Sequence, residues 1–404
     1  MSPLTKIGSC GEAAVSFDGT PAIAIIRNAR VLAPVDLGLR DLLLLGGKVC
    51  VVGQPGMACD APVGWPRPTV YDLSGMTLIP GLVDAHEHLT GGGGEGGPKT
   101  RTPEVSLSML TIAGVTTVVG CLGTDGTTRS MAALLAKANA IEAEGLTTRV
   151  WTGAYQVPPP TLTGSVRDDL VLIDKVIGCG EIAVSDHRSA QPTCHDLRRL
   201  AAECRVGGML GGKPGILHLH VGPGPRGIED LFTIVDEAEI PASQFLPTHM
   251  GRSSMLAGQA ARLTQLGGYA DFTAGDACAA RVTEAIALGA DPARISISSD
   301  GGGSLPRFAA DGTLTGLQVG NPTTLLATYR DLVVGQGCDP STALAMLTAN
   351  PARVIGLAST KGSIAAGADA DLVVLAADGS ARHVWAKGRV MVWDGSPIVR
   401  GTFE

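Results

Sequence analysis

The residues best suited to chemistry are histidines and carboxylates that follow short apolar segments. His86 and His88 lie two residues apart where the apolar segment 78–86 ends. In an extended chain, residues two apart point to the same side, so both imidazoles can bind one divalent ion. The alternative is a pair of buried, hydrogen-bonded histidines, and an H-x-H motif alone does not decide between the two.

Further residues of ligand type end later apolar segments, namely His220, His249 and Asp300. The chain has only 8 histidines among 404 residues, so four of them at such positions exceeds chance. The combination predicts a metal centre. We interpret His218 as a core packing residue, and His195 and His383 as ordinary surface or packing residues. His187 would either support the metal ligands from outside the site or contact the site directly.

Two neighbouring metal ions need a bridging anion, and we assign that role to Glu181. It begins the predicted strand 181–186, and no other lysine or carboxylate of that strand is expected to face inward. The alternative is a solvated carboxylate where the strand begins. We favour the bridge, because a carboxylate supplies both the negative charge and two oxygens.

A scaffold must bring these distant segments together. Between residues 80 and 356, short apolar segments alternate with helical patterns, which indicates parallel strands joined by right-handed crossovers. The predicted strands are 78–86, 116–122, 148–155, 181–186, 216–221, 244–249, 269–274 and 294–300. Helical patterns include 130–145, 197–208, 277–289, 323–337 and 341–356. Eight such units predict an α/β fold, a TIM-like (β/α)8 barrel with its reactive residues at the carboxyl ends of the strands.

The two ends of the chain carry a different pattern. Residues 21–79 contain runs rich in Ile and Val with a Gly-Gly turn, and the C-terminal residues contain similar runs with an Asp-Gly turn at 394–395. Such runs and turns are typical of antiparallel hairpins. We therefore predict a small β-sandwich domain from residues 1–79 plus 357–404, beside a catalytic barrel domain of residues 80–356.

Composition narrows the class of protein. A hydrophobic content of 45% with 17% charged residues fits a large buried core, and a net charge of −7 without lysine or arginine runs argues against a nucleic-acid partner. No signal-peptide pattern and no membrane-spanning apolar run is found, so we expect a cytoplasmic protein without a membrane partner. Nine dispersed cysteines without a C-x-x-C pair indicate reduced thiols, with Cys121 as a small buried filler.

The segments around these residues resemble a known superfamily. PGLVDAHEHL, HLHVG, PTHMGR and ISSDGGGS resemble the amidohydrolase superfamily, which has a barrel and a flanking β-sandwich. GGGGEGGPKTRTPEVSLSML, GCLGTD, WTGAYQVP, SDHRSAQP and RVGGMLGGKPG look more narrowly like isoaspartyl (β-aspartyl) dipeptidases. The resemblance extends from about residue 20 to Glu404 and includes segments without metal ligands.

The resemblance implies a binuclear-metal hydrolase that cleaves the β-aspartyl amide bond of dipeptides by attack of a metal-bound hydroxide. It implies two zinc ions per subunit, one held by His86, His88 and Asp300, the other by His220 and His249. Asp300 would also be the catalytic base, and Tyr155 would polarise the scissile carbonyl. A homo-oligomer is implied as well, with an octamer as one candidate.

The resemblance also implies a set of substrate-binding residues: Glu95 for the α-ammonium group, Arg188 and Arg252 for carboxylates, and Thr124, Ser304 and the backbone near Gly93 for the rest of the pocket. An isoaspartyl dipeptide does ask for one acidic and at least two basic groups. The alternatives are a solvated loop carboxylate for Glu95, structural ion pairs for the arginines and a core position for Tyr155.

One position departs from the family. Its usual bridge is a carboxylated lysine at the position of Glu181, seven residues before Arg188. Glutamate is shorter, so the strand must come closer to the metals or bulge, and Gly178 and Gly180 just upstream permit such a shift. A directly encoded carboxylate also predicts that activity does not require bicarbonate or CO2.

Three other functions stay open at this point. A cyclic-amide hydrolase of the dihydroorotase or hydantoinase kind shares the metal site but has no need for Glu95. An amidohydrolase acting on another N-substituted amino acid is possible if Glu181 accompanies altered specificity. A metal-free scaffold is the non-enzymatic alternative, although such proteins usually lose their ligands.

Overall fold

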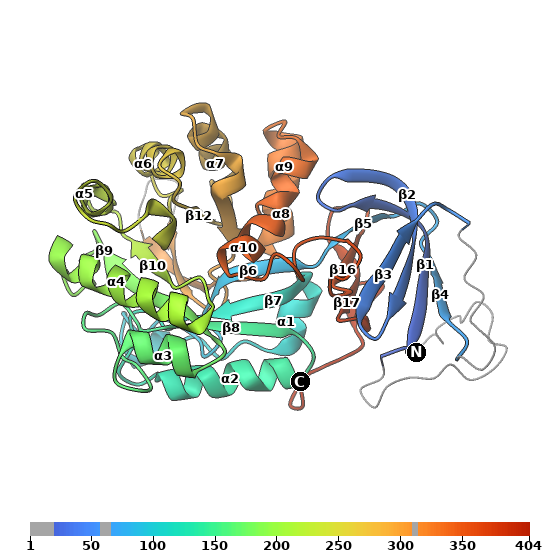
Figure 1. Ribbon diagram of the computed structural model, residues 1–404, viewed down its shortest axis with the longest axis horizontal. Helices are drawn as coiled ribbons and strands as arrows, with labels where there is room; N and C mark the ends of the chain where they lie inside the picture. The colour runs from blue at the N-terminus through green and yellow to red at the C-terminus, as the bar shows by residue number, and fades with distance from the viewer. Residues whose placement is uncertain (1–19, 57–65, 309–313) are drawn as a thin grey trace.

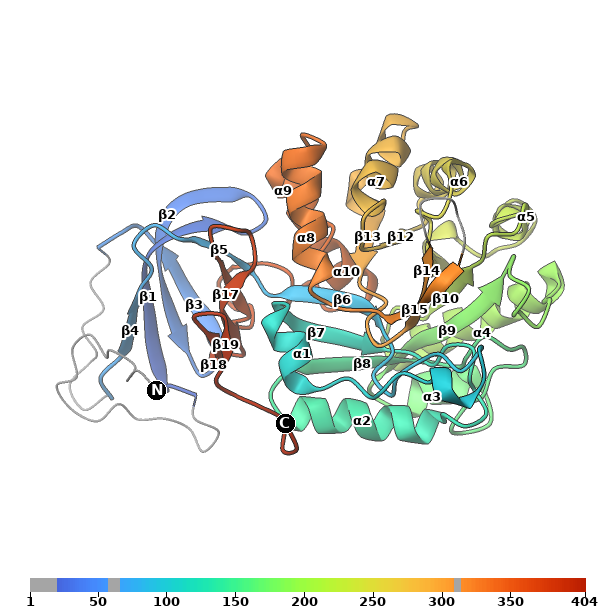
Figure 2. The ribbon, with the colours of Figure 1, turned by 180° about the vertical axis from the view of Figure 1, so that it is seen from behind.

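The computed structural model describes residues 20–56, 66–308 and 314–404. It contains a parallel β structure surrounded by helices and, beside it, a separate and largely antiparallel sheet (Figure 1). The strands from the two ends of the chain, blue and red in Figure 2, lie side by side in that second sheet. In the described ranges, every helix is too short or too polar to cross a membrane.

Eight parallel strands carry the functional residues. Six form one sheet in the order β11-β10-β9-β8-β7-β6, and β12 and β13 form a parallel pair. Their bounds are β6 Leu82–Glu87, β7 Val115–Gly120, β8 Thr147–Thr152, β9 Val176–Val184, β10 Ile216–Val221, β11 Phe245–Thr248, β12 Ala270–Thr273 and β13 Ile295–Ser298. Backbone hydrogen bonds link the pair to both edges of the sheet, from Tyr269 N to Phe245 O (3.3 Å) and from His88 N to Gly301 O (2.8 Å).

The sequence predicted all eight strands, but only 216–221 has the observed bounds, and three of the differences affect the site. Strand 78–86 is divided at Gly81, because β5 (Thr77–Pro80) pairs with the other sheet. Strand 181–186 begins earlier, so Glu181 lies inside β9 rather than at its start. Tyr155 is not the last residue of its strand, since β8 ends at Thr152.

Helices connect these strands, and several begin with a side-chain cap. Ser130 caps α2, Ser253 caps α6, and Thr193 with Asp196 forms a capping box at α4. The α-helices are α1 Leu107–Ile112, α2 Met131–Ala143, α3 Val166–Leu172, α4 Cys194–Gly211, α5 Glu229–Glu237, α6 Ser254–Gln265, α7 Cys278–Ala287, α8 Thr324–Arg330, α9 Pro340–Ala345 and α10 Ala349–Val354. Short 3-10 turns cover Pro98–Thr100, Ala242–Gln244 and Pro292–Arg294.

Two helical predictions need correction. The segment 323–337 is α8 followed by a π-helical turn, Asp331–Gly335, and 341–356 is two short helices rather than one. Thr348, with φ −133° and ψ −84°, separates α9 from α10. The sequence also missed a hairpin, β14 (Ser304–Phe308) with β15 (Leu314–Val319), which follows β13 directly.

The second sheet joins both ends of the chain, as predicted. Its strands are β1 Ile23–Leu32, β2 Asp36–Leu45, β3 Lys48–Gly53, β4 Thr69–Asp72, β5, β16 Leu372–Leu375, β17 Ala381–Ala386, β18 Arg389–Trp393 and β19 Ser396–Pro397. The two ends meet where β16 pairs antiparallel with β5. All nine strands form one hydrogen-bonded sheet, in which β1 also pairs parallel with β4 and β5. Residues 1–19 and 57–65 of the predicted domain lie outside the described residues.

Side chains of the parallel strands alternate between two cores. Leu82, Val118 and Val150 belong to the main apolar core that the helices cover. Val83, Ala85 and Val119 point the other way, into a smaller cluster that also holds Cys121 and the buried Trp151. This alternation alone does not direct His86, because the pairing of β6 with β7 shifts register between Asp84 and Glu87.

Candidate metal centre

Glu181 stands between two pairs of histidines. Its Oε1 lies 2.7 Å from Nδ1 of His220 and 3.2 Å from Nε2 of His249. Its Oε2 lies 3.4 Å from Nε2 of His86 and 3.8 Å from Nε2 of His88. All five side chains are nearly or fully buried. Each carboxylate oxygen therefore faces a different histidine pair, which is the arrangement that a bridging ligand requires.

Asp300 completes the pair formed by His86 and His88. It follows β13, and its Oδ1 lies 3.0 Å from Nε2 of His88 and 3.6 Å from Nε2 of His86. Its φ is +53°, and the φ of His249 is +64°. Such values are uncommon outside glycine and occur often at functional sites. The backbone at both strand ends is thus turned so that the side chain faces the centre.

Two buried atoms in this cluster have no hydrogen-bond partner. They are Nε2 of His86 and Oε2 of Glu181. Leaving a buried polar atom unpaired is costly, so such atoms are expected to have a ligand. A divalent cation between them would satisfy both, and imidazole and carboxylate are ligands that zinc accepts. The described residues therefore fit a metal centre with two ion positions that share Glu181.

The electrostatics differ between the two histidine pairs. Burial lowers the pKa of His86, but the facing Glu181 carboxylate outweighs it and holds that pKa well above its usual value. Burial raises the pKa of Glu181, but the facing His86 and His220 outweigh it and hold that pKa well below its usual range. Burial and the nearby Arg252 lower the pKa of His249 well below normal. Ionised carboxylates and neutral imidazoles are the forms that bind a metal.

A bulge in β9 brings Glu181 into reach. In the pairing of β9 with β10, Leu217 faces Cys179 and Leu219 faces Ile182, so Gly180 and Glu181 together oppose His218. A bulge or a closer approach of this strand was predicted from the short side chain of Glu181, and the bulge is observed. A Cβ on Gly178 would lie 2.2 Å from Ile216 O, and one on Gly180 would lie 2.6 Å from His218 O. Only glycine permits this close approach of the two strands.

The loop residues predicted to bind substrate form a second, charged cluster beside the first. Glu95 Oε1 accepts hydrogen bonds from Thr124 Oγ1 (2.9 Å) and Arg188 Nη1 (3.2 Å). Nη2 of Arg188 lies 3.2 Å from Nε2 of His220, and so does Nη1 of Arg252. One carboxylate and two guanidinium groups thus meet at the edge of the metal cluster.

Tyr155 also contacts His220, with its hydroxyl 2.7 Å from Nδ1. Burial, and next the Glu181 carboxylate, raise the pKa of Tyr155 well above its usual value, so the hydroxyl stays protonated and can donate. Gly93 adopts φ +72°, and a Cβ there would lie 3.0 Å from Cβ of Ser304. The structure thus places the other predicted site residues around Glu181 and Arg188, and it places Gly93 next to Ser304.

Asp186 is a site residue that the sequence reasoning missed. It is buried, and its Oδ2 lies 3.1 Å from Nε2 of His220 and accepts a hydrogen bond from Nη2 of Arg188 (2.8 Å). A carboxylate on one imidazole nitrogen fixes the tautomer, so that the other nitrogen, here Nδ1, would be available to hold a metal ion. Its place at the end of β9, within SDHRS, was the available signal. His187, considered as support for the site, has its side chain 86% exposed, with Nδ1 3.5 Å from Oδ1 of Asp186.

Asp186→Asn is expected to weaken metal binding about 10–100-fold, because losing such a partner of a ligating histidine typically costs that much. A competition titration with a chelator measures the affinity. Asp236→Asn, at an exposed aspartate of α5, is the matched control and should leave affinity unchanged. Equal affinity of Asp186→Asn and wild type would remove Asp186 from this role.

The sequence reasoning also missed a chain of hydrogen bonds that leads from His86 to Asp271. Nδ1 of His86 lies 3.4 Å from Oγ1 of Thr248, which donates to Oδ2 of Asp271 (2.6 Å). Burial raises the pKa of Asp271 to about 6. Because Thr248 donates to Asp271, it can accept from Nδ1 of His86 and so leave Nε2 for a metal. His218 behaves as predicted, buried against Trp151 with its Nδ1 on Leu246 O (3.0 Å).

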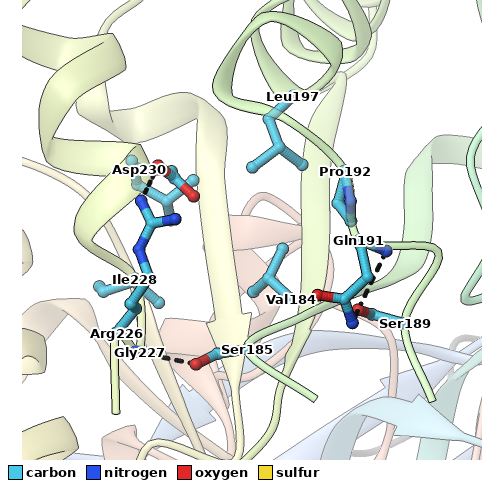
Figure 3. Close-up of a pocket in the computed structure, with 11 residues that line it drawn as sticks. Val184, Ser185, Ser189, Gln191, Pro192, Leu197, Arg226, Gly227, Ile228 and Asp230 are labelled. Atoms are coloured by element: carbon cyan, nitrogen blue, oxygen red, sulfur yellow. Dashed lines mark hydrogen bonds and ion pairs between the residues drawn. The ribbon is translucent and has the colours of Figure 1, made fainter. Parts of the chain in front are cut away.

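The loop that follows β9 contacts the segment before α5. A small pocket separates it from the start of α5, and Figure 3 shows the residues that line this pocket. Ser185 Oγ accepts a hydrogen bond from Gly227 N (3.0 Å), and Arg226 pairs with Asp230 (2.6 Å). The bond from Gly227 to Ser185 joins this loop to the segment before α5, and Asp186 and Arg188 project from the loop toward His220.

Comparisons with known proteins identify similar sequences and folds. Residues 249–391 match the model of the amidohydrolase family. A β-aspartyl dipeptidase from Fervidobacterium islandicum AW-1, solved with β-Asp-Leu, is 45% identical with a TM-score of 0.85, over 93% of this chain and 98% of that one. A second structure of that enzyme is 44% identical with a TM-score of 0.84 over the same shares. An L-hydantoinase from Arthrobacter aurescens, 14% identical with a TM-score of 0.64 over 94% and 98%, shares the fold.

Proposed function

Because this chain belongs to the β-aspartyl dipeptidase family of the amidohydrolases, we propose that it hydrolyses the β-aspartyl (isoaspartyl) amide bond of dipeptides. The observation that carries the proposal is the position of Arg188 and Arg252 beside His220, with Glu95 hydrogen-bonded to Arg188. A cyclic amide has no ammonium group for Glu95 to bind. The similar enzyme from Fervidobacterium was solved with such a dipeptide.

We assign two zinc ions per subunit to the centre. His86, His88 and Asp300 would hold the first, His220 and His249 the second, and Glu181 would bridge them. When bound, such ions polarise a carbonyl and lower the pKa of water to about 7, which makes water a nucleophile at neutral pH. A glutamate bridge is encoded directly, so carboxylation of a lysine is not needed.

The chain's own residues would then move the protons and orient the substrate. Asp300, ionised beside His88, takes a proton from the attacking water and delivers it to the leaving amine. Nearby histidines outweigh burial and hold its pKa below the usual range, so it starts as a base. Tyr155 donates its hydroxyl hydrogen to the carbonyl oxygen as that oxygen gains charge. Glu95 binds the α-ammonium group, and Arg188 and Arg252 bind the carboxylates, with Thr124, Ser304 and Gly93 around them.

Tyr155→Phe is expected to lower kcat about 10²–10³-fold, the usual cost of removing one donor to a developing oxyanion. KM should change far less, because the hydroxyl acts mainly in the transition state. Steady-state kinetics with β-Asp-Leu measures both constants, with Tyr329→Phe on α8 as the control. A mutant with unchanged kcat would exclude Tyr155 as the donor.

Glu95→Gln tests the substrate class. Wild type is expected to prefer β-Asp-Leu over N-succinyl-leucine, which lacks only the ammonium group, by about 10–100-fold in kcat/KM, the value of a hydrogen bond between charged groups. The variant should lose that preference, whereas Glu104→Gln on the exposed surface should keep it. Hydrolysis of hydantoin or dihydroorotate at a higher kcat/KM than β-Asp-Leu would contradict the proposed function.

The scaffold we propose for this activity is a closed (β/α)8 barrel. The backbone bonds from Tyr269 to Phe245 and from His88 to Gly301 support closure at both edges. We take residues 80–356 as the catalytic domain and residues 1–79 with 357–404 as the flanking β-sandwich. We further propose that the enzyme works in the cytoplasm as a homo-oligomer, with an octamer as the specific form to test by light scattering.

A further inference from the structure

We propose that Cys121 is a thiolate ligand of the first metal position, together with His86, His88 and Glu181. The inference rests on the proposed binuclear function and adds a ligand to it. It replaces the sequence interpretation of Cys121 as a packing residue without chemistry.

The position of Cys121 matches that of the other ligands. It follows β7 directly, and β7 pairs with β6, the strand of His86. Its backbone N–H donates to the carbonyl oxygen of Glu87 (2.9 Å), the residue between the two ligating histidines. The side chain is fully buried. The thiol is therefore fixed at the same strand edge as the imidazoles, without contact to solvent.

The distances place the sulfur within a ligand set. Sγ lies 3.7 Å from Nδ1 of His88. Sγ, one nitrogen each of His86 and His88, and one oxygen of Glu181 all lie within 4.8 Å of one another. Atoms that bind the same ion must be this close, and a thiolate, two imidazoles and a carboxylate are a donor set that zinc accepts.

Unpaired atoms in the same group give independent support. Nε2 of His86 and Oε2 of Glu181 are buried and without hydrogen-bond partners, although they are only 3.4 Å apart. A cation shared by these atoms and Sγ would pair both of them, and it would replace the hydrogen bond that the Cys121 thiol donates to the carbonyl oxygen of Glu87 (3.6 Å). The second position, formed by His220, His249 and Glu181, has no cysteine among the described residues that form it.

The two positions would then differ chemically. A thiolate is a soft ligand that favours zinc or cobalt, whereas carboxylate and imidazole alone accept manganese more readily. We expect the first position to hold its metal more tightly and to prefer zinc over manganese. Cys121→Ser keeps the size of the side chain but should reduce both the affinity and this preference, by at least about tenfold.

Cobalt spectroscopy tests the bond itself. The purified full-length enzyme is stripped of metal, reloaded with Co²⁺ alone, and compared with Cys121→Ser, Cys121→Ala and the control Cys204→Ala, which removes a buried thiol from α4. A sulfur-to-cobalt charge-transfer band in the near ultraviolet is expected in wild type and in Cys204→Ala. It should disappear from both Cys121 variants, while the visible cobalt bands of the remaining ligands persist.

Other outcomes overturn the inference. Wild type that binds Co²⁺ but lacks the charge-transfer band would show that the thiol only hydrogen-bonds the His88 ring. A band that survives Cys121→Ala would assign it to another cysteine. Failure of wild type to bind any Co²⁺ would instead refute the proposed binuclear centre. The wild-type spectrum decides the first and third of these outcomes even if a variant does not fold.

Discussion

Glu181→Ala is expected to leave fewer than two metal ions per chain and to abolish most turnover of β-Asp-Leu. Glu181 supplies one oxygen to each histidine pair, so its removal takes a ligand from both positions and leaves four imidazoles facing one another. The loss should well exceed the roughly 10–100-fold cost of removing an outer partner of a ligand. Metal analysis by mass spectrometry and single-substrate kinetics measure the two effects.

Two controls accompany the Glu181→Ala prediction. Glu237→Ala removes an exposed glutamate of α5 and should keep both metals and full turnover. Wild type should be equally active in buffer freed of bicarbonate and CO2, since the bridge is encoded directly. A Glu181→Ala protein with two ions per chain and normal turnover would refute the bridge.

Asp300→Asn is expected to lower kcat about 10²–10⁴-fold, the range typical of losing a general acid–base catalyst. Asparagine has nearly the same shape, so the contact with Nε2 of His88 can persist while the capacity to accept a proton is lost. The second metal position, which does not use Asp300, should stay occupied. Kinetics and metal analysis on the same preparation distinguish lost chemistry from lost metal.

Asp276→Asn is the matched control, because this exposed aspartate follows β12 as Asp300 follows β13. It should have wild-type kinetics. If Asp300→Asn retained kcat within tenfold of wild type while both metals remained bound, another group would have to carry the proton.

The sequence allowed these candidate ligands to be singled out because a simple rule governs their positions. Reactive residues of parallel α/β proteins lie at the carboxyl ends of strands, and His86, His88, His220, His249 and Asp300 all occur where an apolar run stops. The pairing of the two chain ends into one sheet followed in the same way from hairpin patterns. Local periodicity and turn residues were sufficient for both predictions.

The residues that were missed act through contacts that no local pattern encodes. Asp186 contacts His220 at 3.1 Å because β9 and β10 are neighbours in the sheet. Asp271 contacts Thr248 and is linked to His86 only through it. From the sequence alone, Cys121 cannot be distinguished from a packing residue. Only the pairing of β6 with β7 brings it to the strand edge that carries the histidines. The early start of β9 was missed because its bulge interrupts the alternation of inward and outward residues around Glu181.

Zinc anomalous diffraction from crystals of the metal-loaded enzyme tests the central claim most directly. Two peaks are predicted on opposite sides of the Glu181 carboxylate, one beside His86 and His88, the other beside His220 and His249. One peak alone, two peaks without Glu181 between them, or no peak at this site in zinc-replete crystals would contradict the account.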